Sequence, residues 1–182
     1  MANEDLEKAL GCFRNAIRID KRHYNAWYGL GMVYYRQEKY ELAQFHFERA
    51  LEINPASPAL RCYVGMALHM HQRFEEALEQ FDKAIQLSYR NPLLRFKRAK
   101  TLVMMERYQD ALEELEKTKD LAPKEASIYR LLSEVYRNLG DKQKSLLNMT
   151  WATNLDQRAG GPGNKTLGQS DDDKIVDDEL GI

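Results

Sequence analysis

Apolar and polar positions along the chain follow a pattern that is clearest in residues 24–57. The first half of this block places large and small apolar residues three or four positions apart, and the second half does the same. That spacing is typical of one buried face of an α-helix. The residues that define the pattern are Trp27, Leu30, Gly31, Tyr34, Ala43, Phe47, Ala50 and Pro55. The block therefore predicts two amphipathic helices joined by a short turn.

The same pattern recurs at steps of 34 residues. Starting from Phe47, the steps lead forward to Phe81, Leu115 and Met149 and back to Phe13. This period and these residue types are those of the tetratricopeptide repeat (TPR), in which helical hairpins stack on one another. The sequence therefore predicts an all-α fold, a TPR right-handed superhelix (α-α solenoid) of about four and a half repeats.

The period also predicts where each unit begins and ends. Residues 1–23 are expected to hold the second helix of a truncated TPR, with a helix at 3–19, and residues 158–182 to form a disordered acidic tail. The four complete repeats are predicted at 24–57, 58–91, 92–125 and 126–157. Their helices are predicted at 24–37, 40–53, 58–71, 74–87, 92–105, 108–121, 126–139 and 142–155.

Residue size within the repeat indicates how the helices pack. The eighth position is always small, which allows the two helices of a hairpin to approach closely. It is occupied by Gly31, Gly65, Ala99 and Ser133, and the twentieth by Ala43, Ala77, Ala111 and Ser145. The series Phe13, Phe47, Phe81, Leu115 and Met149 is expected to wedge each second helix against the next hairpin. Ser57-Pro58 and Asn91-Pro92 are typical of helix starts.

Charge and targeting signals narrow the classes of function. The formal net charge is −1, with −3 on residues 158–182 and +2 on residues 1–157, so no basic surface indicates nucleic acid. The N-terminal sequence lacks a signal-peptide pattern, and no apolar run approaches the length of a membrane span. Cys12 and Cys62 lie inside helical patterns, which favours a reducing compartment and small core or groove residues.

No catalytic or metal-binding constellation is predicted. His69 and His71 are two positions apart on a helix and so point in different directions. Glu75, Glu76 and Glu79 lie beside Lys83 on an amphipathic helix, a pattern typical of a solvated face. We therefore expect no catalytic residue, no metal and no cofactor. Arg98 occupies a position that is apolar in the other repeats, so it must pair with an acid or extend its charged end to water.

The surface is then the expected place of function. In a TPR stack the first helices line a groove, which makes their second, fifth, ninth and twelfth positions candidates for partner contact. The candidate set is Asn25, Tyr28, Met32, Tyr35, Cys62, Met66, His69, Phe96 and Lys100. Tyrosine and methionine give adaptable apolar contact, and Asn25 can bond the backbone of an extended peptide. The alternative is that a third to a half of the groove positions pack between repeats.

Several sequence runs are more specific than the repeat pattern. They are the run from His23 to Gly31, HYNAWYGLG, followed by YRQEK at 35–39, and the later NPLLRFKRA, APKEASIYRLLSEVY and WATNLD. Over about residues 8–156 the chain resembles the C-terminal TPR array of the Cdc27-type scaffold subunit of the anaphase-promoting complex. This resemblance implies a non-catalytic scaffold in a ubiquitin ligase that acts in mitosis, in the nucleus and cytoplasm.

The resemblance also implies partners. In the family, the array receives the C-terminal Ile-Arg tails of coactivators and of a core subunit and contacts neighbouring TPR subunits. The family's homodimer forms through an N-terminal array, which residues 1–182 are not expected to include. Neither nucleic acid nor membrane is an expected partner. Three other interpretations stay open: a generic TPR adaptor, the TPR arm of a larger enzyme such as a glycosyltransferase, and a structural spacer.

Overall fold

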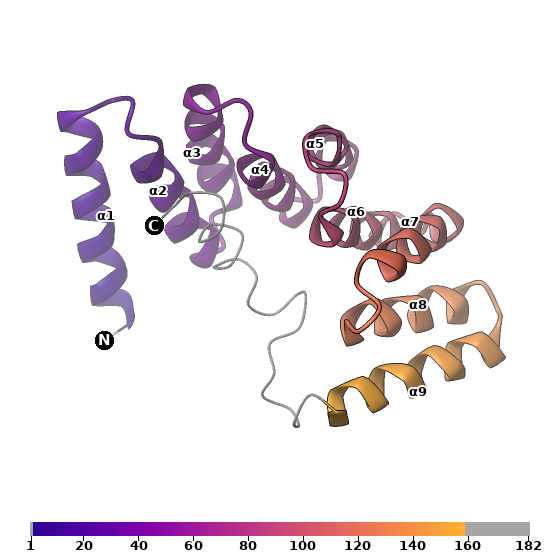
Figure 1. Cartoon of the computed structure of the whole chain (residues 1–182). Helices are drawn as coiled ribbons and strands as arrows, with labels where there is room; N and C mark the ends of the chain where they lie inside the picture. The colour runs from indigo at the N-terminus through magenta and orange to yellow at the C-terminus, as the bar shows by residue number, and fades with distance from the viewer. Residues whose placement is uncertain (1, 159–182) are drawn as a thin grey trace. The chain divides into compact units, whose positions relative to one another are not determined.

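The computed structural model describes residues 2–158, and side chains from residue 7 onward, and every regular element in this part of the chain is an α-helix (Figure 1). The chain divides into two compact units, unit 1 (Met1–Ser88) and unit 2 (Tyr89–Ile182), which are described separately. Unit 1 contains α1 (Ala2–Ile19), α2 (Tyr24–Arg36), α3 (Tyr40–Ile53), α4 (Pro58–Met70) and α5 (Phe74–Leu87). Unit 2 contains α6 (Pro92–Met104), α7 (Tyr108–Leu121), α8 (Ala126–Asn138) and α9 (Lys142–Arg158).

The predicted helix positions agree with this structure to within one residue at nearly every end. The exception is α9, which continues to Arg158 and so includes one residue that the sequence assigned to the tail. The rest of the predicted acidic tail, 159–182, lies outside the described residues. The 34-residue period is therefore a reliable guide to the helical hairpins.

Local side-chain chemistry explains where these helices begin and turn. Ser57 Oγ accepts a hydrogen bond from Leu60 N (3.2 Å), and Asn91 Oδ1 accepts one from Leu93 N (3.0 Å), with proline at the first helical position in both cases. Each hairpin turn contains one left-handed residue at the same repeat position. These residues, with their φ angles, are Glu38 (59°), Gln72 (61°), Glu106 (58°) and Gly140 (84°).

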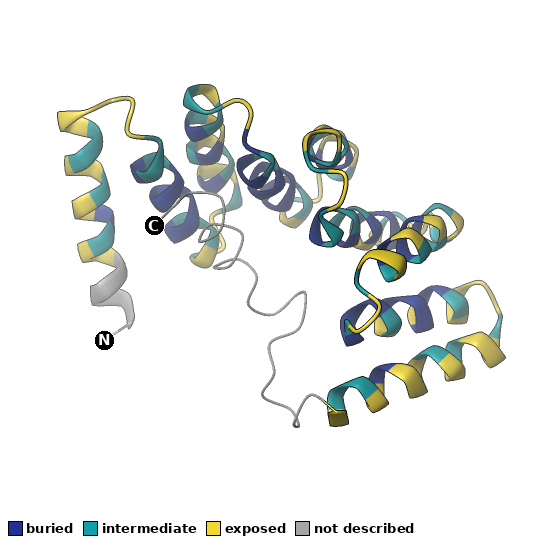
Figure 2. Cartoon of the chain, in the orientation of Figure 1, coloured by how far each residue is buried: buried dark blue, intermediate teal, exposed yellow. Residues whose placement is uncertain are grey.

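The core of unit 1 is built from aromatic rings that lie over glycines. The Phe47 ring of α3 is fully buried, lies against Gly31 of α2, and has its centroid 5.3 Å from that of Tyr63 in α4. Phe81 of α5 lies over Gly65 of α4 in the same way. Phe47 thus contacts its own hairpin and the next one, as the repeat predicts. Figure 2 shows α4 as the most continuously buried helix of this unit.

Replacing Gly31 by alanine is expected to destabilise unit 1. An added Cβ would lie 2.5 Å from atoms of the buried Phe47 ring, so the ring or the helix must shift. Overpacking of this kind costs about 1–3 kcal/mol, which should exceed the roughly 1 kcal/mol gained from helix propensity. The measurement is the free energy of unfolding in urea.

The matched control is Gly11→Ala in α1, where an added Cβ meets nothing within 4 Å. This control should raise stability slightly, because alanine is the better helix former. Equal effects of the two substitutions would contradict a close approach at Gly31.

In unit 2 small polar residues replace the glycine contact. Ser133 Oγ of α8 donates to Ser145 O of α9, and Ser145 Oγ donates to Ser133 O, both at 2.8 Å. These reciprocal bonds satisfy both hydroxyl groups where the two helices approach closely.

Leu115 of α7 is fully buried, as its place in the wedge series predicts. Met149 differs: its side chain is 47% exposed, because α9 has no following hairpin packed on it among the described residues.

Candidate functional site

The candidate groove residues of unit 1 form a layered surface on α2 and α4. Tyr28, Met32 and Met66 are buried with only their edges exposed, and Cys62 is fully buried. Asn25, Tyr35 and His69 are half-buried at the margin. We call Tyr28, Met32 and Met66 the groove floor. We call Asn25, Tyr35 and His69 the groove rim. Burial is thus more extensive than the third to a half expected from the sequence.

The groove floor is continuous with the core of unit 1. The Tyr28 ring lies edge-on to Tyr63 (centroids 5.2 Å apart) and tilted against Phe47 (5.9 Å). Tyr28 therefore supports the fold as well as the surface, because its ring is held from two helices. A partner that reaches this floor meets the edges of side chains that are packed into the core.

The groove rim is held by second-helix aromatic residues. Tyr35 packs edge-on against Tyr40 (5.5 Å, 67°), and His69 packs in the same way against Phe74 (5.5 Å, 63°). Asn25 Oδ1 is buried and has no hydrogen-bond partner among the described residues. An unsatisfied buried amide oxygen is costly, so this group favours a donor brought by a partner or by solvent.

The remaining candidate residues lie in unit 2. Phe96 of α6 is buried, whereas Lys100 is exposed one turn further along the same helix. Nearby, Glu114 of α7 is buried and accepts a hydrogen bond from Arg95 Nη1 (3.2 Å), while Arg98 Nη1 lies 3.9 Å from its other oxygen. Arg98 therefore pairs with an acid, one of the two outcomes that the sequence allows.

A second aromatic cluster of unit 1 did not emerge from the sequence. The His46 ring of α3 lies between Trp27 (5.6 Å) and Tyr34 (5.1 Å, interplanar 7°) of α2, and the exposed Phe45 packs against its edge (5.2 Å). The Tyr34 hydroxyl accepts a hydrogen bond from Arg14 Nη2 (2.9 Å). The sequence did contain a signal for this cluster, because Trp27 and Tyr34 are signature residues of the repeat and their rings need packing partners.

His46 is expected to make unit 1 sensitive to acid. Burial and then the positive charge of Arg14 lower the pKa of His46 below its usual value. Below about pH 6.5 the unfolded chain therefore takes up a proton that the folded chain resists, and stability falls as the pH drops. Above that pH both states are neutral at this residue and the effect vanishes.

Urea unfolding at pH 7.5 and at pH 5.5 measures this dependence. The loss of stability between the two should be smaller in His46→Gln than in the unchanged chain. The control His71→Gln removes a different histidine and should retain the larger loss. A His46→Gln chain with the unchanged pH dependence would contradict the assignment.

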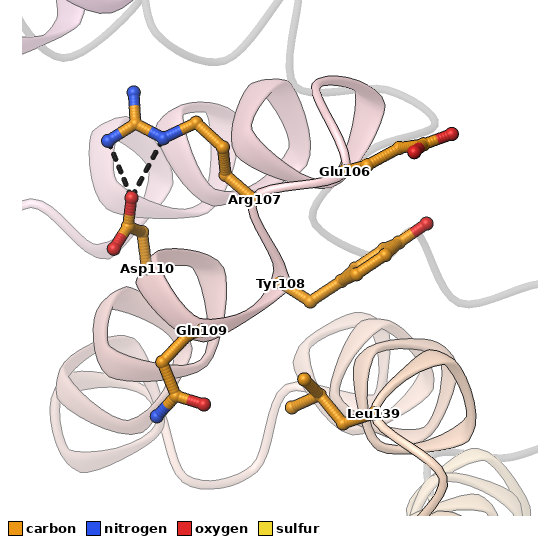
Figure 3. Close-up of a pocket in the computed structure, with 6 residues that line it drawn as sticks. All are labelled: Glu106, Arg107, Tyr108, Gln109, Asp110 and Leu139. Atoms are coloured by element: carbon orange, nitrogen blue, oxygen red, sulfur yellow. Dashed lines mark hydrogen bonds and ion pairs between the residues drawn. The ribbon is translucent and has the colours of Figure 1, made fainter.

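A pocket of ≈ 270 Å³ lies in unit 2, between the turn before α7 and the end of α8 (Figure 3). Its lining includes Tyr108 and Gln109 of α7 and Leu139 just beyond α8. Arg107 and Asp110 also line it, but they bond to each other, with Arg107 Nε 2.8 Å from Asp110 Oδ2. Two of the charged groups of the lining are therefore already paired with each other, and the pocket is smaller than typical ligand cavities.

Metal and membrane chemistry find no support in the described part of the chain. Among residues with described side chains, no three His, Cys, Asp or Glu groups are placed to hold a metal ion. None of the described helices combines the length and the apolar character of a membrane span.

Cys12 is exposed, which corrects its assignment to the core or groove, whereas Cys62 is buried. Cys12 lies on α1, and among the described residues no helix precedes α1 to cover the face that carries this cysteine.

Two tetratricopeptide-repeat family models match the chain, one at residues 24–57 and one at residues 68–135. Together they cover more than half of its length. Solved structures agree in fold. A crystal structure of MamA superposes with a TM-score of 0.79 at 17% identity, over 87% of this chain and 92% of MamA. YrrB, described as a TPR protein with an unusual peptide-binding site, gives 0.70 at 24% identity, over 86% and 80%.

Curated relatives match at higher identity. The anaphase-promoting complex subunit 3 of Schizosaccharomyces pombe is 43% identical over 158 residues, 87% of this chain and 24% of that protein. The cell division cycle protein 27 homolog of Caenorhabditis elegans is 50% identical over 158 residues, 87% and 20% respectively. The chain thus spans a quarter or less of the length of these relatives. It belongs to the tetratricopeptide-repeat family, and its repeats form an array of the Cdc27 type.

Proposed function

We propose that this chain is a non-catalytic docking array within an anaphase-promoting-complex type of ubiquitin ligase. One observation carries the proposal: identity of 43–50% over 87% of the chain to relatives named as subunit 3 of that complex or as its Cdc27 homolog. The chain then works in the nucleus and cytoplasm. It contributes surfaces that hold other proteins in place, and the ligase chemistry belongs to other parts of the assembly.

The surface proposed for docking is the groove of unit 1. Its floor of Tyr28, Met32 and Met66 is largely apolar and packs on the core of the unit, which suits an aliphatic side chain. At its rim lie the half-buried polar residues His69 and Asn25, and the buried Asn25 Oδ1 lacks a hydrogen-bond partner among the described residues. Polar groups of this kind suit the backbone of an extended segment. Little ordering cost falls on the protein, since the floor is already packed.

The ligand proposed for this groove is a C-terminal segment that ends in Ile-Arg. The isoleucine side chain fits the apolar floor. The arginine requires an acid, and none of the candidate groove residues is one. The apolar residues of unit 1 therefore support binding of the isoleucine but offer no partner for the arginine. Neighbouring TPR subunits are the second class of proposed partner.

Fluorescence anisotropy with a labelled peptide ending in Ile-Arg tests the groove. We expect binding that is lost when the last two residues are removed, and that weakens roughly tenfold, equivalent to about 1.4 kcal/mol, in Tyr35→Ala or His69→Ala. Phe45→Ala is the matched control, since Phe45 is an exposed aromatic residue outside the groove. Equal loss in Phe45→Ala, or no loss in the rim variants, would overturn the assignment of the groove.

Affinity purification of the full-length protein tests membership in the complex independently of the peptide. Copurification of ubiquitin-ligase subunits is the expected outcome. Copurification with a sugar-nucleotide transferase activity would instead support the TPR arm of a larger enzyme. Absence of ligase subunits would refute the proposal.

A further inference from the structure

The outer face of α9 is apolar, and no described residue of unit 2 covers it. We define it as Leu146, Met149, Thr150 and Thr153, which follow one another at helical spacing on one side of the helix. Leu146 is 70% exposed and Met149 is 47% exposed. Figure 2 shows exposed residues along most of α9. An exposed apolar face of this kind is typical of an interaction surface.

Equivalent faces inside each unit are covered. Phe47 of α3 occupies the repeat position of Met149 and is fully buried, with Tyr63 of α4 packed on it. Leu115 of α7 occupies the same position and is also fully buried. The outer face of α9 therefore resembles a type of interface that the chain uses elsewhere, but none of the described segments covers it.

The two threonines add to the apolar character of this face. Thr150 Oγ1 donates to Leu146 O, and Thr153 Oγ1 donates to Met149 O, both at 3.0 Å. These bonds turn the hydroxyl groups back onto the helix. Burial of the threonines against an apolar segment therefore leaves no hydroxyl without a partner.

Charge indicates what kind of segment fits. The α8–α9 hairpin, residues 126–158, carries five basic and three acidic residues, and its acid Asp156 bonds to Arg130 Nη2 (2.5 Å). Lys142 lies one turn before Leu146 in line with the outer face. A segment that combines acidic and aliphatic residues complements such a surface.

The chain carries such a segment. Residues 171–182, DDDKIVDDELGI, hold six acids, one lysine and the aliphatic residues Ile175, Val176, Leu180 and Ile182. We propose that residues 171–182 dock on the outer face of α9 of the same chain. The aliphatic side chains cover Leu146 and Met149, and the carboxylates face the basic hairpin.

The connecting sequence permits this docking. Residues 159–170 separate the end of α9 from the acidic segment and can span up to about 40 Å when extended. Met149 lies nine residues before Arg158, or roughly 14 Å along the helix. The connection includes four glycines, which make it adaptable. The segment can therefore run back along α9 without strain.

A spin label at Asp178→Cys tests the proposal in the full chain. Cys12→Ser removes the exposed native thiol, and Cys62 is buried. We expect the methyl signal of Met149 to lose intensity by paramagnetic broadening, relative to the same chain with the spin label reduced. The loss should be reversed in Ile175→Ser/Val176→Ser/Leu180→Ser, because these substitutions remove the apolar contact and retain the charge. Asn164→Ser/Leu167→Ser/Gln169→Ser, outside the acidic segment, should leave the broadening unchanged.

The remaining outcomes are decisive against the proposal. Equal intensity of the Met149 signal with the label oxidised and reduced would show that the segment does not dock on α9. Broadening that the triple aliphatic substitution leaves intact would show that the aliphatic residues do not make the contact. Broadening that appears when spin-labelled chains are mixed with separate isotope-labelled chains would assign the face to a second copy.

Discussion

Phe47→Ala should lower the free energy of unfolding by about 3–5 kcal/mol, the range for a fully buried phenylalanine. Phe47 belongs to α3 and is 0% exposed. Its ring lies over Gly31 of α2 on one side and against Tyr63 of α4 on the other. Removal of the ring leaves a cavity at the contact of two hairpins. Gly31 has no side chain with which to fill it. The measurement is urea unfolding followed by far-ultraviolet circular dichroism.

The control for this prediction is Phe45→Ala, two residues away on the same helix. Phe45 is 51% exposed and contacts the ring of His46 at the surface. Its removal should cost no more than about 1 kcal/mol, since little apolar area leaves the core. If Phe47→Ala and Phe45→Ala destabilise the chain equally, the wedge role of Phe47 is wrong.

The helices were predictable because the repeat specifies them redundantly. Period, small residues at the close contacts and proline after a capping side chain all give the same boundaries, as at Ser57-Pro58. One feature of the fold needed the structure. Met149 follows the wedge pattern, but a wedge is buried only when a hairpin follows it, and this depends on what is packed beyond α9.

The candidate groove was less predictable than the fold. Its residues were chosen by repeat position, and position does not decide how far a side chain sinks into the core. Met66 and Lys100 occupy the same position in successive repeats, yet Met66 is buried and Lys100 is exposed. Packing of Tyr28 between Phe47 and Tyr63 depends on three helices at once. That long-range information is absent from a local pattern.

Glu114 shows the same difficulty for charged residues. A glutamate in a second helix is usually solvated, and nothing at residue 114 itself indicates that this one is only 7% exposed. The clue was Arg98, an arginine at an apolar position that needs an acid. The structure supplies that acid from α7, together with a contact to Arg95 and one to Lys117 (Nζ 3.1 Å from Oε1).

Glu114→Ala is therefore expected to lower the free energy of unfolding by about 2–4 kcal/mol. The loss arises because Arg95 and Arg98, both mostly buried, remain as like charges without the carboxylate between them. Glu114→Gln should recover only part of this, since the amide retains a hydrogen-bond acceptor but not the charge. Urea unfolding at low and at moderate salt measures both effects.

The matched control is Glu113→Ala, at the exposed neighbouring position of α7. Surface charges contribute little and are screened by salt, so this variant should change stability by less than about 0.5 kcal/mol. The Glu114→Ala effect should persist at moderate salt, because mobile ions do not reach a buried carboxylate. A small, salt-sensitive effect at Glu114 would mean that the arginines are held by packing of their aliphatic stems instead of by the ion pair.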